Sequence, residues 1–207
     1  MPRTSKQLWL PILLFAVIAV GVSVAYQRYR AGDIQMAEAQ QAFKAERFDL
    51  AEAAYARATQ VAPNNAEAWY WLGISRRNQG LVATAADALS KATELDDSHT
   101  VWWIACAETL QWSKRFAEAE KAWQRALDQL KPKDGQLKPK DGRMIEIQIN
   151  MARSIASQGE IDRAQKLLED LLAVQDDPQI RSVLAELLAG AGRFEESANQ
   201  YRKALQQ

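Results

Sequence analysis

The side chains that could carry out chemistry are few in this sequence and lie far apart. The one histidine, His99, closely follows Asp96 and Asp97. A histidine beside two carboxylates is a conceivable metal site, but residues of these types are also what a turn and a helix cap require. Glu195 and Glu196 could form an acid–base pair, yet adjacent side chains on a helix diverge by about 100° and cannot share one substrate.

Motifs for nucleophilic, redox or phosphate chemistry are absent from the sequence. A catalytic site needs a nucleophile, a base and an orienting group that converge, and we find no glycine-rich phosphate loop and no Cys-x-x-Cys pair. The one cysteine, Cys106, falls at an apolar helix position and is expected to be buried. Basic and acidic residues number 26 each, without the clustered basic charge that nucleic acid requires. We therefore predict that the chain is not an enzyme, has no catalytic, cofactor-binding or metal site, and binds neither nucleic acid nor a small-molecule substrate.

The remaining residues belong to a helical pattern centred on residues 66–99. Two helices are predicted there, Ala66–Gln79 and Val82–Leu95, with Gly80 in the turn between them. Apolar residues three and four positions apart form one face of each helix, and small residues such as Gly73 let the two helices approach closely. Such a hairpin cannot bury its apolar face alone and needs a copy of itself alongside.

Copies of this hairpin occur on both sides of the central stretch. The second-helix triplet Ala85, Leu89 and Ala92 recurs about 34 residues upstream and downstream, and twice more toward the C-terminus. The matching triplets are Ala51, Tyr55 and Ala58; Ala119, Trp123 and Ala126; Ala164, Leu168 and Leu171; and Ser197, Tyr201 and Ala204. With its large first-helix residue and its Leu-Gly pair, the pattern resembles the tetratricopeptide repeat family. The resemblance implies an all-α fold, an α-solenoid of about five helical hairpins at about 32–65, 66–99, 100–130, 145–177 and 178–207.

Three copies depart from the pattern at the large first-helix position. Trp69 and Trp103 occupy this position in the second and third copies, whereas the other copies have Gln35, Gln148 and Arg181. We expect a weaker contact at this position in the fourth and fifth copies and a less certain first helix in the first copy.

The N-terminal part of the chain has a different character. A short basic tail at 1–7 precedes residues 8–26, which contain no charged side chain. At about 1.5 Å per residue this stretch can span a hydrocarbon core of roughly 30 Å. We predict a single transmembrane signal-anchor helix at 8–26 that precedes the repeat array at 27–207, with Gly32-Asp33 as the one expected break between them. A signal peptide cleaved near Ser23-Val24-Ala25 is the alternative.

The orientation in the membrane depends on the flanking charges. Basic residues flank both ends of the apolar stretch, so their count does not decide it. A short basic N-terminus before an apolar stretch is typical of a signal anchor, which leaves the tail in the cytoplasm. We therefore predict a single-pass inner (plasma) membrane protein whose repeats lie in the periplasm of a bacterium.

A loop insertion at 131–143 separates the third and fourth repeats. It contains the hexapeptide Leu-Lys-Pro-Lys-Asp-Gly twice, at 130–135 and 137–142. Two prolines and two Asp-Gly pairs predict a loop rather than a helix. Its lysines form either a solvated surface or a docking surface.

The resemblance also implies where a partner would bind. In the family, ligands are contacted mainly by first-helix positions two, five, nine, twelve and thirteen of each repeat, which line a concave groove. On this sequence the predicted partner-binding groove consists of Tyr70, Ile74, Arg77, Asn78, Ile104, Glu108, Gln111, Trp112, Ile149 and Arg153. Trp112 lies outside the packing pattern, so it either anchors a partner or packs on a neighbouring hairpin or on the lysine- and proline-containing loop. Aromatic residues and arginine are frequent interface anchors.

Together these features predict a membrane-anchored scaffold or assembly factor. It would bind a protein or peptide partner, itself membrane-associated, and help assemble an envelope complex. One alternative is a repeat-containing subunit of a c-type cytochrome maturation system that presents apocytochrome, which the N-terminal anchor and the Trp-Gln-Arg-Ala-Leu segment before the proline-containing loop resemble. The other alternative is a constitutive structural subunit of a membrane complex.

Overall fold

The computed structural model describes residues 6–130 and 142–206, and the side chains of all of these except residues 6–12 and 24–31. Within these ranges the chain forms ten α-helices and no strand. The helices are α1 (Lys6–Lys44), α2 (Phe48–Val61), α3 (Ala66–Asn78), α4 (Val82–Leu95), α5 (Thr100–Trp112), α6 (Phe116–Leu130), α7 (Gly142–Ser157), α8 (Ile161–Val174), α9 (Pro178–Gly190) and α10 (Phe194–Ala204). The prediction of an all-α fold is confirmed.

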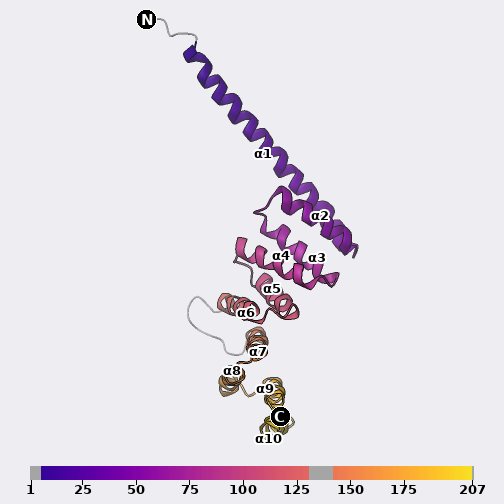
Figure 1. Cartoon of the computed structure of the whole chain (residues 1–207), viewed down its shortest axis with the longest axis vertical. Helices are drawn as coiled ribbons and strands as arrows, with labels where there is room; N and C mark the ends of the chain where they lie inside the picture. The colour runs from indigo at the N-terminus through magenta and orange to yellow at the C-terminus, as the bar shows by residue number, and fades with distance from the viewer. Residues whose placement is uncertain (1–5, 131–141, 207) are drawn as a thin grey trace.

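Consecutive helices pair into five hairpins that stack in chain order. Within each hairpin an odd-numbered helix, here called the first helix, packs against the even-numbered helix that follows it. Each second helix of the first four hairpins also packs against the first helix of the next hairpin. The result is a helical solenoid, and Figure 1 shows α1 extending away from one end of the stack. The predicted architecture of repeated hairpins is therefore confirmed.

The five hairpin turns share one backbone conformation. Gly80, Gly159 and Gly192 have positive φ angles of 78°, 87° and 78°. Glu46 and Lys114 occupy the equivalent places in the first and third turns, with φ angles of 57° and 61°. Glycine adopts this left-handed conformation most easily. The first and third hairpins therefore keep the same turn geometry without the residue that favours it.

The core runs along the stack between the two rows of helices. One cluster extends from Ile74 in α3 to Leu188 in α9, and a smaller one around Tyr55 joins the first two hairpins. Small residues allow the helices to cross closely: a Cβ atom added at Gly73 would lie 2.6 Å from Cγ of Leu89. Gly73 and Leu89 therefore fit together as the sequence predicted.

Helix α1 runs without interruption from Lys6 to Lys44. The predicted break at Gly32-Asp33 is therefore wrong. Gly32 is buried near the Cβ atom of Ala62, 4.0 Å from where its own Cβ would lie. Packing of α2 along this part of α1 outweighs the low helix propensity of glycine, which costs about 1 kcal/mol.

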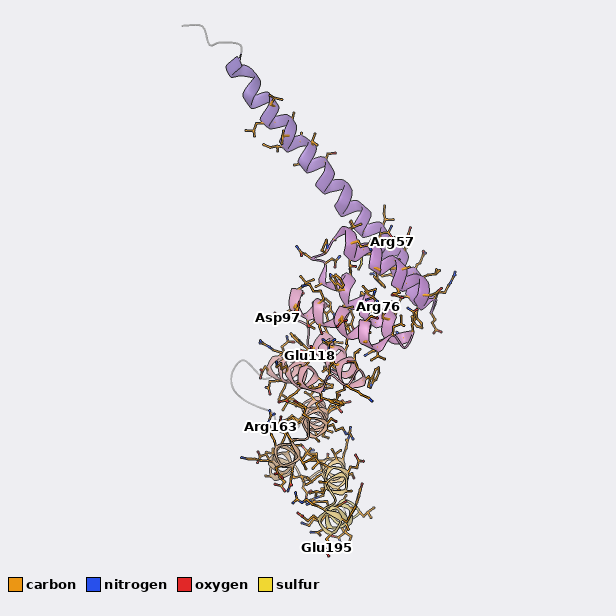
Figure 2. The ribbon with its side chains drawn as sticks, viewed as in Figure 1. Arg57, Arg76, Asp97, Glu118, Arg163 and Glu195 are labelled. Atoms are coloured by element: carbon orange, nitrogen blue, oxygen red, sulfur yellow. The ribbon has the colours of Figure 1, made fainter. Side chains whose placement is uncertain are left out.

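The N-terminal half of α1 carries apolar side chains away from the rest of the fold. Those of Leu13, Leu14, Phe15, Val17, Ile18, Val20 and Val22 are each more than half exposed. Figure 2 shows side chains standing out from the ribbon along this half of α1, with no other element beside it. In the part of the chain that the structure describes, no helix has the length and apolar character needed to cross a membrane.

Two predicted segments fall largely outside the described residues. The structure covers only the backbone of Lys6 and Gln7 in the basic tail at 1–7. Within the expected insertion at 131–143, it covers only Gly142 and Arg143, where α7 begins. The expected cleavage site at Ser23-Val24-Ala25 includes residues whose side chains are not described. The anchor and its cleavage therefore stay predictions.

Candidate partner-binding face

The predicted groove residues lie on the first helices α3, α5 and α7. The accessible surface of α3, α5, α7 and α9 is called the first-helix face below. Of the predicted residues, eight have accessible side chains: Tyr70, Arg77, Asn78, Ile104, Glu108, Gln111, Trp112 and Arg153. Two are buried, and they are discussed after the contacts that the accessible residues make.

The C-terminal ends of α3 and α5 bring together an arginine, a glutamate and a tryptophan. Nη1 of Arg77 lies 3.1 Å from Oε2 of Glu108 in an ion pair. The guanidinium carbon of Arg77 also lies 5.6 Å from the ring centroid of Trp112. Glu108 and Trp112 are four residues apart on α5, so both reach toward α3. Trp112 contacts the neighbouring hairpin through Arg77, yet its side chain remains 60% exposed.

The N-terminal ends of the same helices carry an aromatic stack. The rings of Tyr70 and Trp102 are 4.9 Å apart and nearly parallel, at 13°. The ring centroids of His99 and Trp102 are 4.3 Å apart, and the two rings are tilted by 37°. Burial raises the pKa of Tyr70, and Arg77 opposes this shift without reversing it, so the phenol stays a neutral hydrogen-bonding group. Trp102 was not predicted, because it is outside the ligand positions of the repeat pattern.

His99 has a structural position at the beginning of α5. It is the N-cap residue of this helix, and its Nε2 atom lies 3.3 Å from Oδ2 of Asp96. Hydrogen bonds from Ser98 lower the pKa of Asp96, with a smaller contribution from His99. In the described ranges, no three histidine, cysteine or acidic side chains are close enough together to hold a metal ion.

Polar contacts continue along the first-helix face into the last two hairpins. Nε2 of Gln111 donates to the backbone oxygen of Asn150 at 3.1 Å, which joins α5 to α7. Arg153 lies 3.7 Å from Glu186, which joins α7 to α9. Glu186 was not predicted, although it follows Arg153 by about one repeat, much as Glu108 follows Arg77. A search for arginine and glutamate one repeat apart would have found it.

Two of the predicted groove residues lie in the core. Ile149 is 1% exposed and Ile74 is 7% exposed, and both belong to the larger core cluster. They support the first-helix face from beneath and present no surface to a partner. Helix α7 is buried on several sides, with residues from Met144 to Ile155 contributing to the core, so the family positions carried onto this helix select the buried Ile149 as well as the accessible Arg153.

A second set of ion pairs ties the hairpins together elsewhere. Arg76 pairs with Glu52 at 3.0 Å, Arg115 with Asp87 at 2.5 Å, and Arg163 with Glu120. Figure 2 shows Arg76 and Arg163 at different levels of the stack. Each pair connects one hairpin to the second helix of the preceding one. Accessible pairs of this kind contribute about 0–1 kcal/mol each, so we interpret them as ties between repeats.

The fold and the sequence have clear relatives. A tetratricopeptide repeat model matches residues 36–99 and 149–207, more than half of the chain. The crystal structure of MamA protein is 21% identical, with a TM-score of 0.67, covering 85% of this chain and 91% of that chain. YrrB, described as a TPR protein with an unusual peptide-binding site, is 16% identical, with a TM-score of 0.64 and coverage of 83% and 84%. TTC0263, a thermophilic TPR protein of Thermus thermophilus, is 25% identical, with a TM-score of 0.50 and coverage of 85% and 91%. No curated protein matches the chain.

Proposed function

This chain belongs to the tetratricopeptide repeat family, and we propose that it is a membrane-anchored scaffold that helps assemble a complex of the cell envelope. The repeat fold is one that binds proteins or peptides, and repeats of this family generally act as scaffolds rather than enzymes. The observation that carries the proposal is Trp112, a tryptophan that stays 60% exposed on the first-helix face beside an ion-paired arginine.

The chemistry of the face favours a polypeptide partner of mixed character. Tryptophan and arginine are the side chains that most often dominate binding energy at protein interfaces. Glu108 holds the Arg77 guanidinium in place, so little side-chain entropy remains to be lost on binding. The negative charges of Glu108 and Glu186 balance the positive charges of Arg77 and Arg153 along the face. An amphipathic helix or an extended peptide fits this pattern better than a highly charged ligand.

The apolar part of α1 is the basis for the membrane anchor. Residues 8–26 carry no charge, and the described side chains from Leu13 to Val22 point outward all around the helix. A helix that is apolar on every side is stable in a core or in a membrane, not in water. Because α1 continues into the first hairpin, an anchor here would hold the array close to the bilayer and raise the effective concentration of a membrane partner.

We place the repeats in the periplasm, with the basic tail in the cytoplasm. Protease added to spheroplasts should then degrade the array, whereas protection of the array until the membrane is permeabilised would overturn this orientation. Replacement of Val17 and Ile18 by arginine should release the chain from the membrane fraction, since each arginine costs about 2.5–3.5 kcal/mol at the centre of an inserted helix. Retention in that fraction would contradict the anchor.

The experiment that tests the binding proposal is a pull-down from native membranes in gentle detergent. We expect a defined partner set with the intact protein and its loss from the Trp112→Ala, Arg77→Ala double variant. The matched control is Lys91→Ala, Arg125→Ala, which changes two exposed residues on second helices. Equal circular dichroism at 222 nm shows that each variant is folded.

Two results would contradict the proposal. If the partners stay bound to the Trp112 and Arg77 variant but are lost when residues 1–30 are replaced by another anchor, recognition lies in the N-terminal helix. If the intact protein aggregates unless it is purified with a fixed set of subunits, it is a permanent structural subunit and exchanges no partner.

A further inference from the structure

Among the described residues, nothing covers one side of helix α10. The other side packs on α9, where Oγ of Ser197 donates to the backbone oxygen of Ala185 at 2.8 Å. Four exposed residues with apolar or aromatic side chains follow the uncovered side at spacings of four, three and four, which places them on one face of the helix. They are Phe194, Ala198, Tyr201 and Leu205, and they are called the α10 stripe below. Figure 1 shows α10 at the opposite end of the stack from α1.

The other four hairpins bury the position that Tyr201 occupies. Tyr201 is 41% exposed, whereas its equivalents in the inner second helices are at most 1% exposed. These equivalents are Tyr55, Leu89, Trp123 and Leu168. In each inner hairpin, the first helix of the next hairpin packs on the second helix and runs antiparallel to it. The α10 stripe therefore has the form of a surface that takes one more antiparallel helix.

The middle of the stripe differs from the inner second helices in polarity. In α2, α6 and α8 the residue equivalent to Ala198 accepts a hydrogen bond from an arginine of the next hairpin. These acceptors are Glu52, Glu120 and Gln165. The stripe is thus apolar at a place where three inner helices are polar, and its small alanine lets another helix approach closely.

The spacing of the stripe is the same in both chain directions. If two copies of α10 pack antiparallel, Phe194 of one copy lies opposite Leu205 of the other, and Ala198 lies opposite Tyr201. A small residue then meets a large one near the centre, as close packing requires. A two-fold axis repeats both contacts, because the same patch serves both copies.

The charges beside the stripe suit the same pairing. Glu195 and Arg202 line one shallow hollow together with Phe194 and Ala198, so both lie along the same edge of the stripe. Figure 2 shows Glu195 at the outer end of the stack. The same edges of two antiparallel helices face each other, so Glu195 of each copy comes near Arg202 of the other. Charges beside an apolar seam select helix orientation in this way.

The opposite end of the stack is a poorer complement to the stripe. The exposed side of α1 has a hollow lined by Ile34 and Ala37 and otherwise by polar or charged residues. These are Glu38, Gln40, Gln41 and Lys44. A head-to-tail contact would bury these groups against Phe194 and Leu205, and burial of unpaired polar groups is costly.

We propose that the α10 stripe is a self-association surface at which two copies of this chain pack α10 against α10 in antiparallel orientation. Each copy supplies to the other the helix that the inner hairpins obtain from the next repeat. The two arrays then join at their α10 ends. The stripe lies on a second helix and does not depend on the proposed function of the first-helix face.

The test measures self-association of the full chain in detergent micelles by sedimentation equilibrium. We expect a monomer–dimer equilibrium without larger species. Tyr201→Glu should weaken the dimer at least tenfold, because it buries two charges at the apolar centre. The matched control is Leu50→Glu on α2, where Leu50 is similarly exposed at 42%, and it should leave the dimer unchanged. If Tyr201→Glu alters the circular dichroism, Ala198→Glu tests the same centre at an exposed side chain.

Exchange of charges tests the antiparallel orientation. Glu195→Arg and Arg202→Glu each bring like charges together and should weaken the dimer roughly fivefold. A mixture of these two variants should form heterodimers more tightly than either variant forms homodimers, because every close pair is then of opposite charge. Charges near helix ends also interact with the helix dipole, but that effect acts within one chain and gives no gain on mixing.

Chemical crosslinking tests the two-fold axis. In a Cys106→Ala background, Ala198→Cys should crosslink to its own copy with a short bismaleimide, because this residue lies near the axis. The matched position is Lys203 on the far side of the helix from the stripe, and Lys203→Cys should not crosslink.

Four outcomes would overturn the proposal. A chain that stays monomeric at every concentration would leave a helix of another protein as the occupant. Larger species that grow with concentration, without the Ala198→Cys crosslink, would indicate head-to-tail stacking. A dimer that survives both Tyr201→Glu and Ala198→Glu would associate through another surface, such as α1. Mixing of the charge variants without any gain would exclude the antiparallel pairing.

Discussion

The close approach of α3 and α4 at Gly73 gives a prediction whose size follows from the structure. A Cβ atom at position 73 would lie 2.6 Å from Cγ of Leu89 and 3.1 Å from the backbone oxygen of Ala85. Carbon atoms attract most strongly at about 3.5–4.0 Å, so Gly73→Ala forces atoms together. Overpacking costs about 1–3 kcal/mol, and the gain in helix propensity returns about 1 kcal/mol. We expect a net loss of about 1 kcal/mol in the free energy of unfolding.

The Leu89→Ala background should reverse this effect. Leu89→Ala alone should cost about 2–5 kcal/mol. With the leucine side chain gone, Gly73→Ala retains its gain in helix propensity and loses most of its clash, so it should be neutral or stabilising by up to about 1 kcal/mol. Urea denaturation followed at 222 nm measures all four members of the cycle, provided that the m value is unchanged.

A second helical glycine serves as a control that measures the effect of helix propensity without a steric clash. Gly190 ends α9 and has open space around its Cβ direction, so Gly190→Ala should not destabilise the chain. If Gly73→Ala has the same effect with and without Leu89, the two residues are not coupled, and the explanation of the close helix crossing is wrong.

Three further predictions concern the turns and the titrating groups. Lys114→Gly should raise the free energy of unfolding by about 0.5–1 kcal/mol in urea, because Lys114 has a left-handed φ of 61°. Hydrogen bonds from Arg115 lower the pKa of Glu118. That stabilisation is complete above the ordinary glutamate pKa and is lost as the pH falls through the lower folded pKa, so the melting temperature of Arg115→Gln should depend less on pH in the acid range below the ordinary glutamate pKa. Burial raises the pKa of Cys106, so iodoacetamide at about pH 8 should modify this thiol only as fast as the hairpins open.

The helix periods and turn residues carry most of the information about the fold. The predicted helix Val82–Leu95 has the same bounds in the structure, because Gly80 precedes it in a turn and Asp96 follows it in an extended conformation. Local propensity misled at Gly32, where contact with the end of α2 keeps α1 helical. Tertiary packing decides such positions, and a single sequence does not display it.

The sequence predicted where the candidate site lies, but not the side-chain contacts within it. Trp112 was identified because a tryptophan outside the packing pattern has no core role, and it is exposed. The contact between Trp112 and Arg77 depends on side-chain orientations across two repeats, which periodicity leaves open. Gln148 predicted a weaker contact in the fourth hairpin, but the hollow beside it required side-chain coordinates.

The most direct test of the central claim is site-specific photo-crosslinking in native membranes. A benzoylphenylalanine residue would replace Trp112 on α5 in one protein and Lys91 on the second helix α4 in another. We predict that position 112 forms a defined set of protein adducts and that position 91 forms none of them. Identical adducts from both positions, or adducts from position 91 alone, would contradict the assignment of partner binding to the first-helix face.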